Sequence, residues 1–452
     1  MRLFAFLSID ILKNSITIGN INLMKRLLNL YIKSNPLLIF FPFFIIFVLI
    51  ILRFNSDVLA GDEGRYYEFS KNIILGFYSP PAPDINLWSG PGYPLVLVPF
   101  VWLNAPLVVI KLANAVFQYF SIIFLFHAIT RYVSRGYALL FSFSWALYYI
   151  SYQELYSMLT EPLASFLCAL ILYLITRKNS LGQLTNKYLI FTGLALGFLA
   201  LTKIIFGYVI IGMLVICSIY FLIRGGKGKG GKCILLLLTS LALNVPYLIY
   251  TYNLTGKIFY WGNSGGSSLY WMSTPVEGEY GDWNNSTFTA NCGHDLKIPC
   301  NSNLIAKNHQ ENIDYIGQHP IIDQDDAFKV LAINNIKNYP VKYVRNIISN
   351  FSRLFFGIPN SYFYQREQTI WRILPNSIVL TLLFFSAVIS IANLMRITYE
   401  VKLIVGVTYL YLLLSLLVSA YPRQLYVVVP FLFFWFAYIF NRALVFKLRF
   451  VF

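Results

Sequence analysis

The stretch LAGDEGRYYEF, residues 59–69, places two carboxylates, Asp62 and Glu63, directly after the first long apolar run of the chain. Charge is scarce elsewhere, because only 12% of the 452 residues are charged and 58% are hydrophobic. A soluble domain carries roughly 25% charged residues, whereas lipid removes the need for a charged surface. The composition therefore predicts an all-α polytopic membrane protein, with the acidic pair just beyond a membrane-length segment.

Apolar runs long enough to cross a bilayer, which takes about 20 residues, recur along the chain. Ten spans are predicted, at 36–53, 107–130, 137–151, 159–176, 188–204, 206–223, 233–251, 375–395, 403–420 and 425–441. An even number of spans leaves both termini on one side of the membrane. The apolar stretch 94–105 is too short to span, so we expect it to lie at the interface or to re-enter the membrane.

The formal net charge of +16 comes mostly from lysines and arginines in short loops between the apolar runs. In a soluble protein such a charge suggests a nucleic-acid partner. In a membrane protein, basic loops mark the cytoplasmic side. We therefore predict no nucleic-acid partner and place both termini in the cytoplasm, together with the loop RGGKGKGGK at 224–232. That loop lacks the GxxxxGK[ST] spacing of a phosphate-binding loop.

This topology divides the chain into four parts. They are a cytoplasmic lead-in at 1–35, an N-terminal transmembrane module at 36–251 with its first outer loop at 54–106, a non-cytoplasmic segment at 252–374, and the last transmembrane helices with a basic tail at 375–452. Within the outer segment, residues 341–356 have helical periodicity, with Val344, Ile348 and Phe351 on one face. This helix is expected either to rest on the membrane surface or to pack on protein.

The five cysteines fall into two groups. Three lie in or beside apolar runs and are expected to be buried small residues: Cys168, Cys217 and Cys233. Cys292 and Cys300 share the outer segment, in CGHDLKIPC, and an oxidising compartment predicts a disulfide between them. A metal site of Cys292, His294 and Cys300 is the alternative.

Asp62 has two open interpretations. Aspartate is a good helix N-cap, and residues 63–75 are predicted to form a short amphipathic helix closed by Gly76, with Tyr66 and Phe69 on its apolar face. The motifs that follow Asp62 along the chain favour a second, chemical interpretation.

Further motifs follow the acidic pair in order and face the same side of the predicted membrane. They are Tyr66 and Tyr67, Pro91-Gly92-Tyr93-Pro94, Thr160-Glu161, Pro246-Tyr247 with Asn253 and Gly256, and Ala332, Ile336 and Pro340. Over about residues 36–440, their order and spacing resemble the C-type (GT-C) glycosyltransferases, in particular the group of protein O-mannosyltransferases and the lipid A aminoarabinose transferase. The sequence Trp88-Ser89-Gly90-Pro91 departs from the aminoarabinose branch, which carries a lysine before its proline pair, and points to the broader bacterial branch.

The resemblance implies a GT-C-type helix bundle of about ten spans in the bacterial inner membrane, with its active site facing the periplasm. It also implies transfer of a sugar from a polyprenyl-phosphate donor to a glycan, lipid or protein acceptor. Such a reaction needs a base for the acceptor hydroxyl and cations for the departing phosphate. Asp62 is the expected base, and Glu63 is expected to position the acceptor or to begin the helix.

Four outer cations are candidates for binding the phosphate: Lys203, Lys257, Arg345 and Arg423. Arg423 has the planar fork that suits phosphate, and its alternative role is to flank the last span. Lys203 and Glu161 either belong to the substrate site or form a structural ion pair. Tyr66 and Tyr93 either stack on sugar or belong to the interfacial aromatic belt. A divalent cation beside Asp62, with Asp84 as a further ligand, stays open, and no cofactor is assigned.

Two other classes of protein remain as alternatives. A polytopic transporter would show internal repeats and polar residues near the bilayer midplane, whereas the acidic residues here gather at the outer rim. An O-antigen polymerase or ligase would act on a diphosphate-linked glycan and rely on outer arginines and a histidine. His294, His309 and His319 in the outer segment keep that alternative open.

Overall fold

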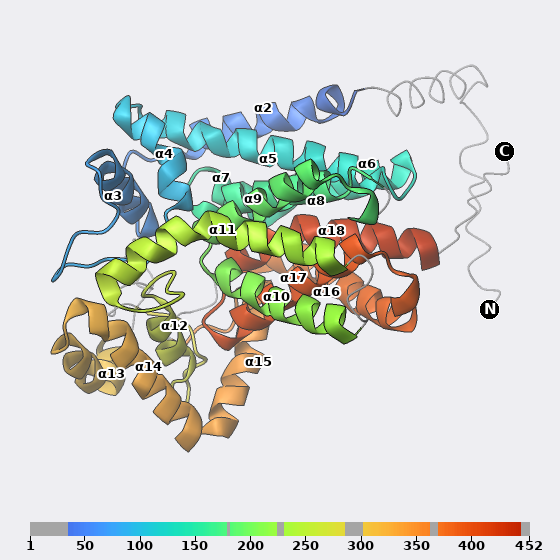
Figure 1. The fold of residues 1–452 in the computed structure, drawn as a ribbon. Coiled ribbons are helices and arrows are strands. Elements are labelled where there is room, and N and C mark those ends of the chain that lie inside the picture. The colour runs from blue at the N-terminus through green and yellow to red at the C-terminus, as the bar shows by residue number, and fades with distance from the viewer. Residues whose placement is uncertain (1–34, 179–180, 224–229, 285–301, 362–368, 444–452) are drawn as a thin grey trace, which may run out of the picture.

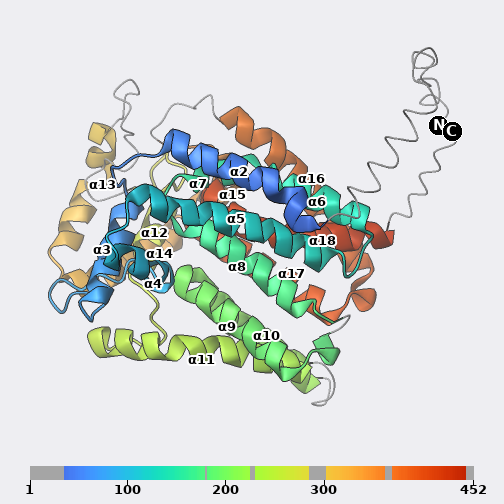
Figure 2. The same cartoon turned by 90° about the horizontal axis from the view of Figure 1, so that it is seen from above.

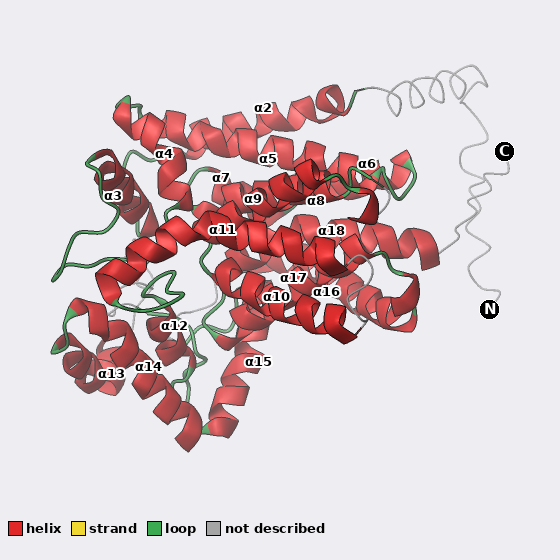
Figure 3. Cartoon of the chain, in the orientation of Figure 1, coloured by secondary structure: helices red, strands yellow, loops and turns green. Residues whose placement is uncertain are grey.

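The computed structural model describes residues 35–178, 181–223, 230–284, 302–361 and 369–443. Within these ranges the chain consists of α-helices, two short 3-10 turns and connecting loops, without a strand (Figure 3). The prediction of an all-α polytopic membrane protein is confirmed, because several of these helices are apolar enough and long enough to cross a bilayer. The predicted disulfide and metal site at Cys292, His294 and Cys300 lie outside the described residues.

Seven long apolar helices form the bundle. They are α2 (Pro36–Phe54), α5 (Leu107–Ile129), α10 (Ile205–Ile223), α11 (Gly230–Thr255), α16 (Thr369–Ala392), α17 (Tyr399–Leu417) and α18 (Pro422–Ala443). α18 lies at the centre, where it packs on α5, α8, α16 and α17. Every residue of α18 from Leu425 to Ile439 is buried, which explains why this helix is apolar all round.

Shorter apolar helices complete the bundle: α4 (Gly92–Trp102), α8 (Thr160–Ile175) and α9 (Asn186–Thr202). The 16 residues of α8 cover only about 24 Å at 1.5 Å per residue, less than the roughly 30 Å hydrocarbon core. Both α8 and α9 are packed among other helices, with α2, α5, α8 and α9 side by side in that order (Figure 2). α4 agrees with the prediction that residues 94–105 do not span.

The prediction of a single span at 137–151 is wrong. The chain instead forms α6 (Arg135–Ala146) and α7 (Tyr149–Leu155), separated by Leu147 and Tyr148. Tyr148 has an extended backbone, and its hydroxyl donates to Asn376 Oδ1 at 2.5 Å. The hydroxyl of Tyr152 donates to the carbonyl of Ala146 at 2.7 Å, which satisfies a backbone group that the break exposes. Hydropathy could not detect this break because both pieces are apolar.

The two ends of the bundle carry different parts of the chain. α2 begins and α18 ends at one end, and α3 and α12–α14 lie at the other (Figure 1). Basic side chains bridge neighbouring loops at the first end: Arg131 donates to the carbonyls of Thr176 and Arg177, and Lys232 donates to those of Gly182 and Leu184. The segments 54–106 and 252–374, both predicted to face outward, therefore share the end opposite these basic loops.

The end opposite the basic loops, called the outer end after the prediction from loop charge, contains α3 (Asp62–Ile74), α12 (Gly265–Met272), α13 (Ser302–Gly317), α14 (Ile321–Asn338) and α15 (Pro340–Phe356). Its small core includes His309, which is buried between Glu279 and Tyr270. His309 Nε2 lies 3.0 Å from each carboxylate oxygen of Glu279, and its Nδ1 lies 2.8 Å from the hydroxyl of Tyr270. These contacts join α13 to the chain around α12.

Helix α15 buries polar side chains and exposes apolar ones. Ile348 is 66% exposed and Val344 is 54% exposed, as a membrane-surface helix requires. The sequence placed Arg353 off the apolar stripe, yet it is fully buried. All five of its N–H donors are used, on the carbonyls of Ala420, Tyr280, Pro359 and Gly281 and on Asn350 Oδ1, at 2.8–3.2 Å. Arg353 thus holds the turn between α17 and α18 in place.

Candidate functional site

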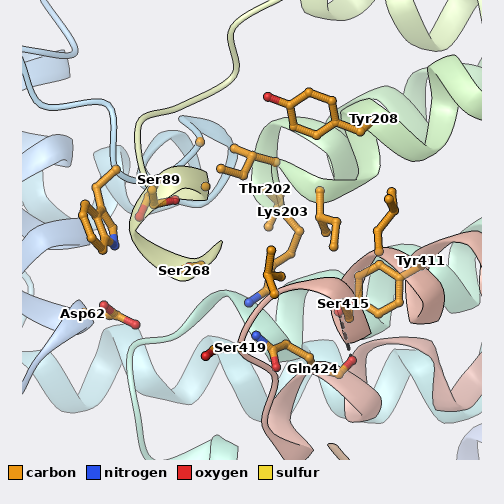
Figure 4. Close-up of a pocket in the computed structure, with 18 of the residues that line it drawn as sticks. Asp62, Ser89, Thr202, Lys203, Tyr208, Ser268, Tyr411, Ser415, Ser419 and Gln424 are labelled. Atoms are coloured by element: carbon orange, nitrogen blue, oxygen red, sulfur yellow. Dashed lines mark hydrogen bonds between the residues drawn. The ribbon is translucent and has the colours of Figure 1, made fainter. Parts of the chain in front are cut away.

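A cavity of about 370 Å³ lies at the outer end of the bundle (Figure 4). Five segments meet around it: the start of α3, the loop before α4, the α9–α10 junction, the start of α12, and the α17–α18 turn. Its described lining is Asp62, Arg65, Tyr66, Trp88, Ser89, Gly90, Thr202, Lys203, Ile204, Ile205, Tyr208, Ser264, Gly265, Ser268, Tyr411, Leu414, Ser415, Leu417, Val418, Ser419 and Gln424. Of the predicted site residues, Asp62, Tyr66 and Lys203 line this cavity.

Asp62 is the first residue of α3 and not its N-cap. The N-cap is Gly61, whose φ of 55° suits a residue without a Cβ. The carboxylate of Asp62 instead accepts from Arg65 at 3.0 Å and from Arg423 at 3.2 Å. The cap interpretation is therefore wrong, and the second partner lies 361 residues away in the sequence.

The surroundings of Asp62 keep it ionised. Burial alone would raise the pKa of this carboxyl, but the charges of Arg423, Arg65 and Lys203 oppose burial and hold the pKa below its ordinary value. The carboxylate is therefore ready to accept a hydrogen bond at neutral pH. It is also a weak base while both arginines hold it.

Glu63 anchors the start of α3. Its Oε1 accepts from the backbone N–H of Met158 at 2.7 Å, and its Oε2 accepts from that of Ala60 at 2.9 Å. Both oxygens are thus engaged with backbone away from the cavity, and Glu63 is buried. This geometry supports the interpretation in which Glu63 begins the helix and positions Asp62.

Glu161 lies at the start of α8 and is 1% exposed. Lys203 Nζ approaches its Oε1 to 2.6 Å, and Arg423 Nε lies 3.8 Å from the same oxygen. Lys203 and Glu161 therefore form the ion pair that one interpretation of the sequence predicted. Since Lys203 also lines the cavity, this pair and Arg423 join Asp62 and Arg65 in one ion-pair network.

The loop before α4 reaches this network because of a glycine. A Cβ placed on Gly90 would lie 2.1 Å from the carbonyl oxygen of Leu201, at the end of α9. The neighbouring carbonyl of Ser89 accepts from the hydroxyl of Tyr78 at 2.6 Å. The Ser-Gly-Pro-Gly sequence therefore lets the loop touch the backbone beside Lys203, which brings Ser89 and Lys203 into one cavity.

Gly90→Ala is expected to lower the yield of folded protein and the melting temperature by several degrees, because the methyl group meets backbone and not a movable side chain. Gly136→Ala is the matched control, since a Cβ there meets nothing within 4 Å. Detergent-solubilised protein would be compared by fluorescence-detected size exclusion and thermal unfolding. Equal stability of the two variants would contradict the close approach.

The cavity has two chemically distinct halves (Figure 4). Asp62, Ser89 and Ser268 lie on one side of the view, Tyr208 and Tyr411 on the other, and Lys203 lies between them. The lining also contains the apolar side chains Ile205, Leu414, Leu417 and Val418, from helices α10 and α17 or the turn that follows α17, while Ser415 and Gln424 lie beside Tyr411 (Figure 4). A molecule that filled the cavity would thus need an apolar part, an anionic centre and a hydroxyl-rich part.

Other predicted site residues lie outside the described lining. Lys257 pairs with Asp326 at 2.7 Å, and Arg345, with a side chain 67% exposed, lies 3.9 Å from Glu277. The prediction that these two cations belong to the site is not supported by this geometry. Tyr93 is buried behind Tyr66, with ring centroids 5.3 Å apart, so it supports the wall of the cavity.

Glu154 is an acidic residue that the sequence interpretation missed. It lies on α7, seven residues before Glu161, in a stretch with few other charges. Burial, with the nearby charge of Glu161, raises its pKa to about 7, although Arg423, Lys203 and Arg372 oppose the shift. The signal was present in the sequence, since a second carboxylate precedes the Thr-Glu motif in the loop between the predicted spans 137–151 and 159–176.

Glu154→Gln is expected to raise the melting temperature at pH 8 and to change it little at pH 5. The pKa of Glu154 is raised on folding, so the native state binds a proton that the unfolded state has already lost between about pH 4.5 and 7. The stabilisation that this proton gives to the folded state is lost as the pH rises. Glutamine does not titrate in this range, so the variant does not suffer that loss. Thermal unfolding of both proteins across this pH range checks the sign. A difference that does not grow with pH would contradict it.

The alternatives that involve histidine or metal acquire no support from the described residues. His309 is buried in the outer core, His319 is half-buried with its Nδ1 3.0 Å from the carbonyl of Tyr315, and Asp84 is exposed outside the cavity lining. No cluster of three or more histidine, cysteine, aspartate or glutamate side chains suited to a metal ion occurs in the part of the chain that the structure describes.

Two solved structures are similar to this chain over most of its length. They are crystal structures of ArnT from Cupriavidus metallidurans, one in the apo state and one bound to undecaprenyl phosphate. The apo structure has 14% sequence identity and a TM-score of 0.38, with 88% of this chain and 76% of that chain covered. The second has 14% identity and a TM-score of 0.39, with 87% of this chain and 76% of that chain covered.

No protein-family model and no curated protein matches the chain. The resemblance to GT-C glycosyltransferases that the motifs carry is thus accompanied by a structural similarity to ArnT. At 14% identity and TM-scores below 0.5, the chemistry of this chain rests on its own residues.

Proposed function

We propose that this protein is a glycosyltransferase that moves a sugar from a polyprenyl-phosphate donor to a glycan, lipid or protein acceptor at the outer face of the membrane. The observation that carries this proposal is the order of chemistry along the cavity. Its apolar lining residues come from α10, α17 and the turn that follows, Lys203 lies in the middle, and Asp62 lies on the other side with Ser89 and Ser268. A polyprenyl-phosphate sugar has the same order of apolar chain, anion and hydroxyl-rich ring.

The charge of the ion-pair network supports a monophosphate donor. The network contains three cations, Arg65, Lys203 and Arg423, and two carboxylates, Asp62 and Glu161, so one positive charge is left over while the neighbouring Glu154, whose pKa is about 7, is protonated. A phosphodiester carries one negative charge and would balance it. A diphosphate-linked donor carries two, and the second would be buried without a partner at considerable cost.

The same network couples phosphate binding to the basicity of Asp62. Arg423 reaches both Asp62 and Glu161 and is only partly buried, so it is able to turn toward a phosphate at the cavity. A phosphate that draws Arg423 away from Asp62 removes one of the charges that lower the pKa of Asp62. The carboxylate then becomes a better acceptor for the proton of the attacking hydroxyl.

Lys203 would stabilise the leaving group. Its ammonium lies beside the cavity, where negative charge grows on the lipid phosphate as the bond to the sugar breaks. Glu161 holds the lysine in this position at 2.6 Å, so the predicted structural pair and the predicted phosphate site are compatible.

A binding experiment that does not depend on the sugar or the acceptor tests this proposal. Purified full-length protein in detergent is titrated with undecaprenyl phosphate, for which we expect saturable binding. The double variant Lys203→Gln/Glu161→Gln, which leaves no unpaired charge from this pair, is expected to bind about tenfold or more weakly. Lys257→Gln, a lysine paired outside the cavity, is the matched control. Absence of saturable binding, or equal loss in both variants, would overturn the proposal.

The orientation in the membrane is a second part of the proposal. We expect Lys329→Cys, on the exposed surface of α14, to react with an impermeant maleimide in intact cells. Lys178→Cys, exposed at the opposite end of the bundle, should react only after lysis. The unmodified chain gives the background from its own cysteines. The reverse pattern would place the cavity on the cytoplasmic side and remove the outer-face reaction.

A further inference from the structure

The charged groups that line the cavity already have partners. Asp62 is bound by Arg65 and Arg423, and Lys203 is bound by Glu161. Glu63 is not part of this network, because both its oxygens accept from backbone N–H groups. Within the described lining, the single positive charge left in the network is therefore the one that the donor phosphate would neutralise.

Besides Asp62 and Arg65, the half of the cavity around Asp62 offers neutral groups. Ser264 and Ser268, at the start of α12, line the cavity, with Ser268 on the side of Asp62 (Figure 4), and no hydrogen bond of either hydroxyl is found within the described residues. Trp88 completes it, with the guanidinium of Arg65 5.1 Å from its ring and Trp283 6.3 Å away. Hydroxyls both donate and accept, and an aromatic ring packs on the C–H face of a sugar, so this lining is suited to an uncharged ring.

We infer that the donor sugar is a neutral one, such as a hexose, and that amino sugars and uronic acids are excluded by the uncharged lining at Ser264, Ser268 and Trp88. This inference rests on the proposed function. A ring ammonium or carboxylate would enter this half of the cavity with no opposite charge left to pair with it. An unpaired buried charge costs enough to lower affinity by about tenfold or more.

The start of α12 is held by a carboxylate that is itself occupied. Asp325 Oδ1 accepts from the backbone N–H groups of Gly266 at 2.7 Å and Ser267 at 3.3 Å. Gly266 is packed against this residue, since a Cβ there would lie 2.0 Å from the carbonyl oxygen of Asp325. Asp325 therefore fixes where Ser268 faces the cavity, and it is not among the residues of the described lining.

Binding by displacement tests the inference. Radiolabelled undecaprenyl phosphate bound to the purified full chain is displaced by three short-chain prenyl-phosphate sugars that differ only in ring charge: a neutral hexose, its 4-amino-4-deoxy analogue and its uronic acid. We expect the neutral compound to bind about tenfold or more tightly than either charged one. Equal or tighter binding of a charged compound overturns the inference. If undecaprenyl phosphate itself fails to bind, the proposed function fails instead.

A change of specificity gives the sharper experiment. Ser268→Asp introduces a carboxylate where Ser268 faces the cavity, near the start of a helix, where a negative charge is favourable. We expect this variant to bind the amino sugar at least as tightly as the neutral one and the uronic acid more weakly still. Ser268→Asn, of the same size but uncharged, should keep the order of the original chain. Misfolding cannot produce tighter binding of the amino sugar. If Ser268→Asp kept the order of affinities of the original chain, the sugar ring would lie elsewhere and the inference would be overturned.

Discussion

Asp62→Asn is expected to lower sugar transfer by about 100-fold or more while undecaprenyl phosphate binds at least as tightly as before. Asparagine cannot take the proton of an attacking hydroxyl, which accounts for the loss of turnover. It also releases Arg423 from an ion pair of 3.2 Å, and the freed guanidinium is then more available to the phosphate. Turnover and binding therefore move in opposite directions, which loss of folding does not produce.

Transfer from a radiolabelled polyprenyl-phosphate hexose in membranes, normalised to protein level, measures the first quantity. Glu68→Gln is the matched control on the same helix, because Glu68 is exposed and pairs only with Lys71. It should stay within about twofold of the unmodified chain. Glu63→Gln is expected to reduce the amount of folded protein, since it weakens the bonds to Met158 and Ala60. Near-normal transfer by Asp62→Asn would falsify the assignment of Asp62 as the base.

Arg423→Gln is expected to cost about 100-fold in transfer and to weaken binding of undecaprenyl phosphate by about tenfold. The arginine is shared by Asp62 and Glu161, and hydrogen bonds to charged groups contribute roughly 1.5–3 kcal/mol each. Arg423→Lys keeps the charge but loses the planar fork, so its loss should be intermediate.

Arg345→Gln is the matched control for this prediction. Its guanidinium is exposed and makes only a 3.9 Å contact with Glu277, so binding and transfer should stay within about twofold. Isothermal titration and the same transfer assay separate the two quantities. If Arg423→Gln bound undecaprenyl phosphate normally, the arginine would be a structural partner of Asp62 and not a phosphate ligand.

Some features of this protein were determined by the sequence alone. Scarce charge and long apolar runs identify an all-helical membrane protein, because a lipid-facing helix must be apolar along its whole length. The position of LAGDEGRYYEF after the first such run places Asp62 at the outer end of the bundle. The requirement for a glycine in the loop before α4 is also a property of one position in the sequence, since only a residue without a Cβ approaches backbone as closely as Gly90 does.

Other features required the tertiary structure. Hydropathy reports which residues avoid water, but it does not report which neighbour satisfies a buried polar group. Arg353 therefore appeared in the sequence as an exposed cation, although its five hydrogen bonds bury it, three of them to carbonyls of distant loops. The break between α6 and α7 was hidden for the same reason, since the hydroxyl of Tyr148, at the break, donates to Asn376 on another helix.

The surroundings of Asp62 were also decided in three dimensions. In the local sequence alone, an aspartate at the start of a short helix favours a helix cap, and the later motifs favour a reactive carboxylate. Only the folded bundle brings Arg423, 361 residues later in the chain, to the carboxylate of Asp62. Ion pairs fall off steeply with distance and are strengthened by burial, so the packing of α18 against the outer end, and not the local sequence, sets the charge and the pKa of this carboxylate.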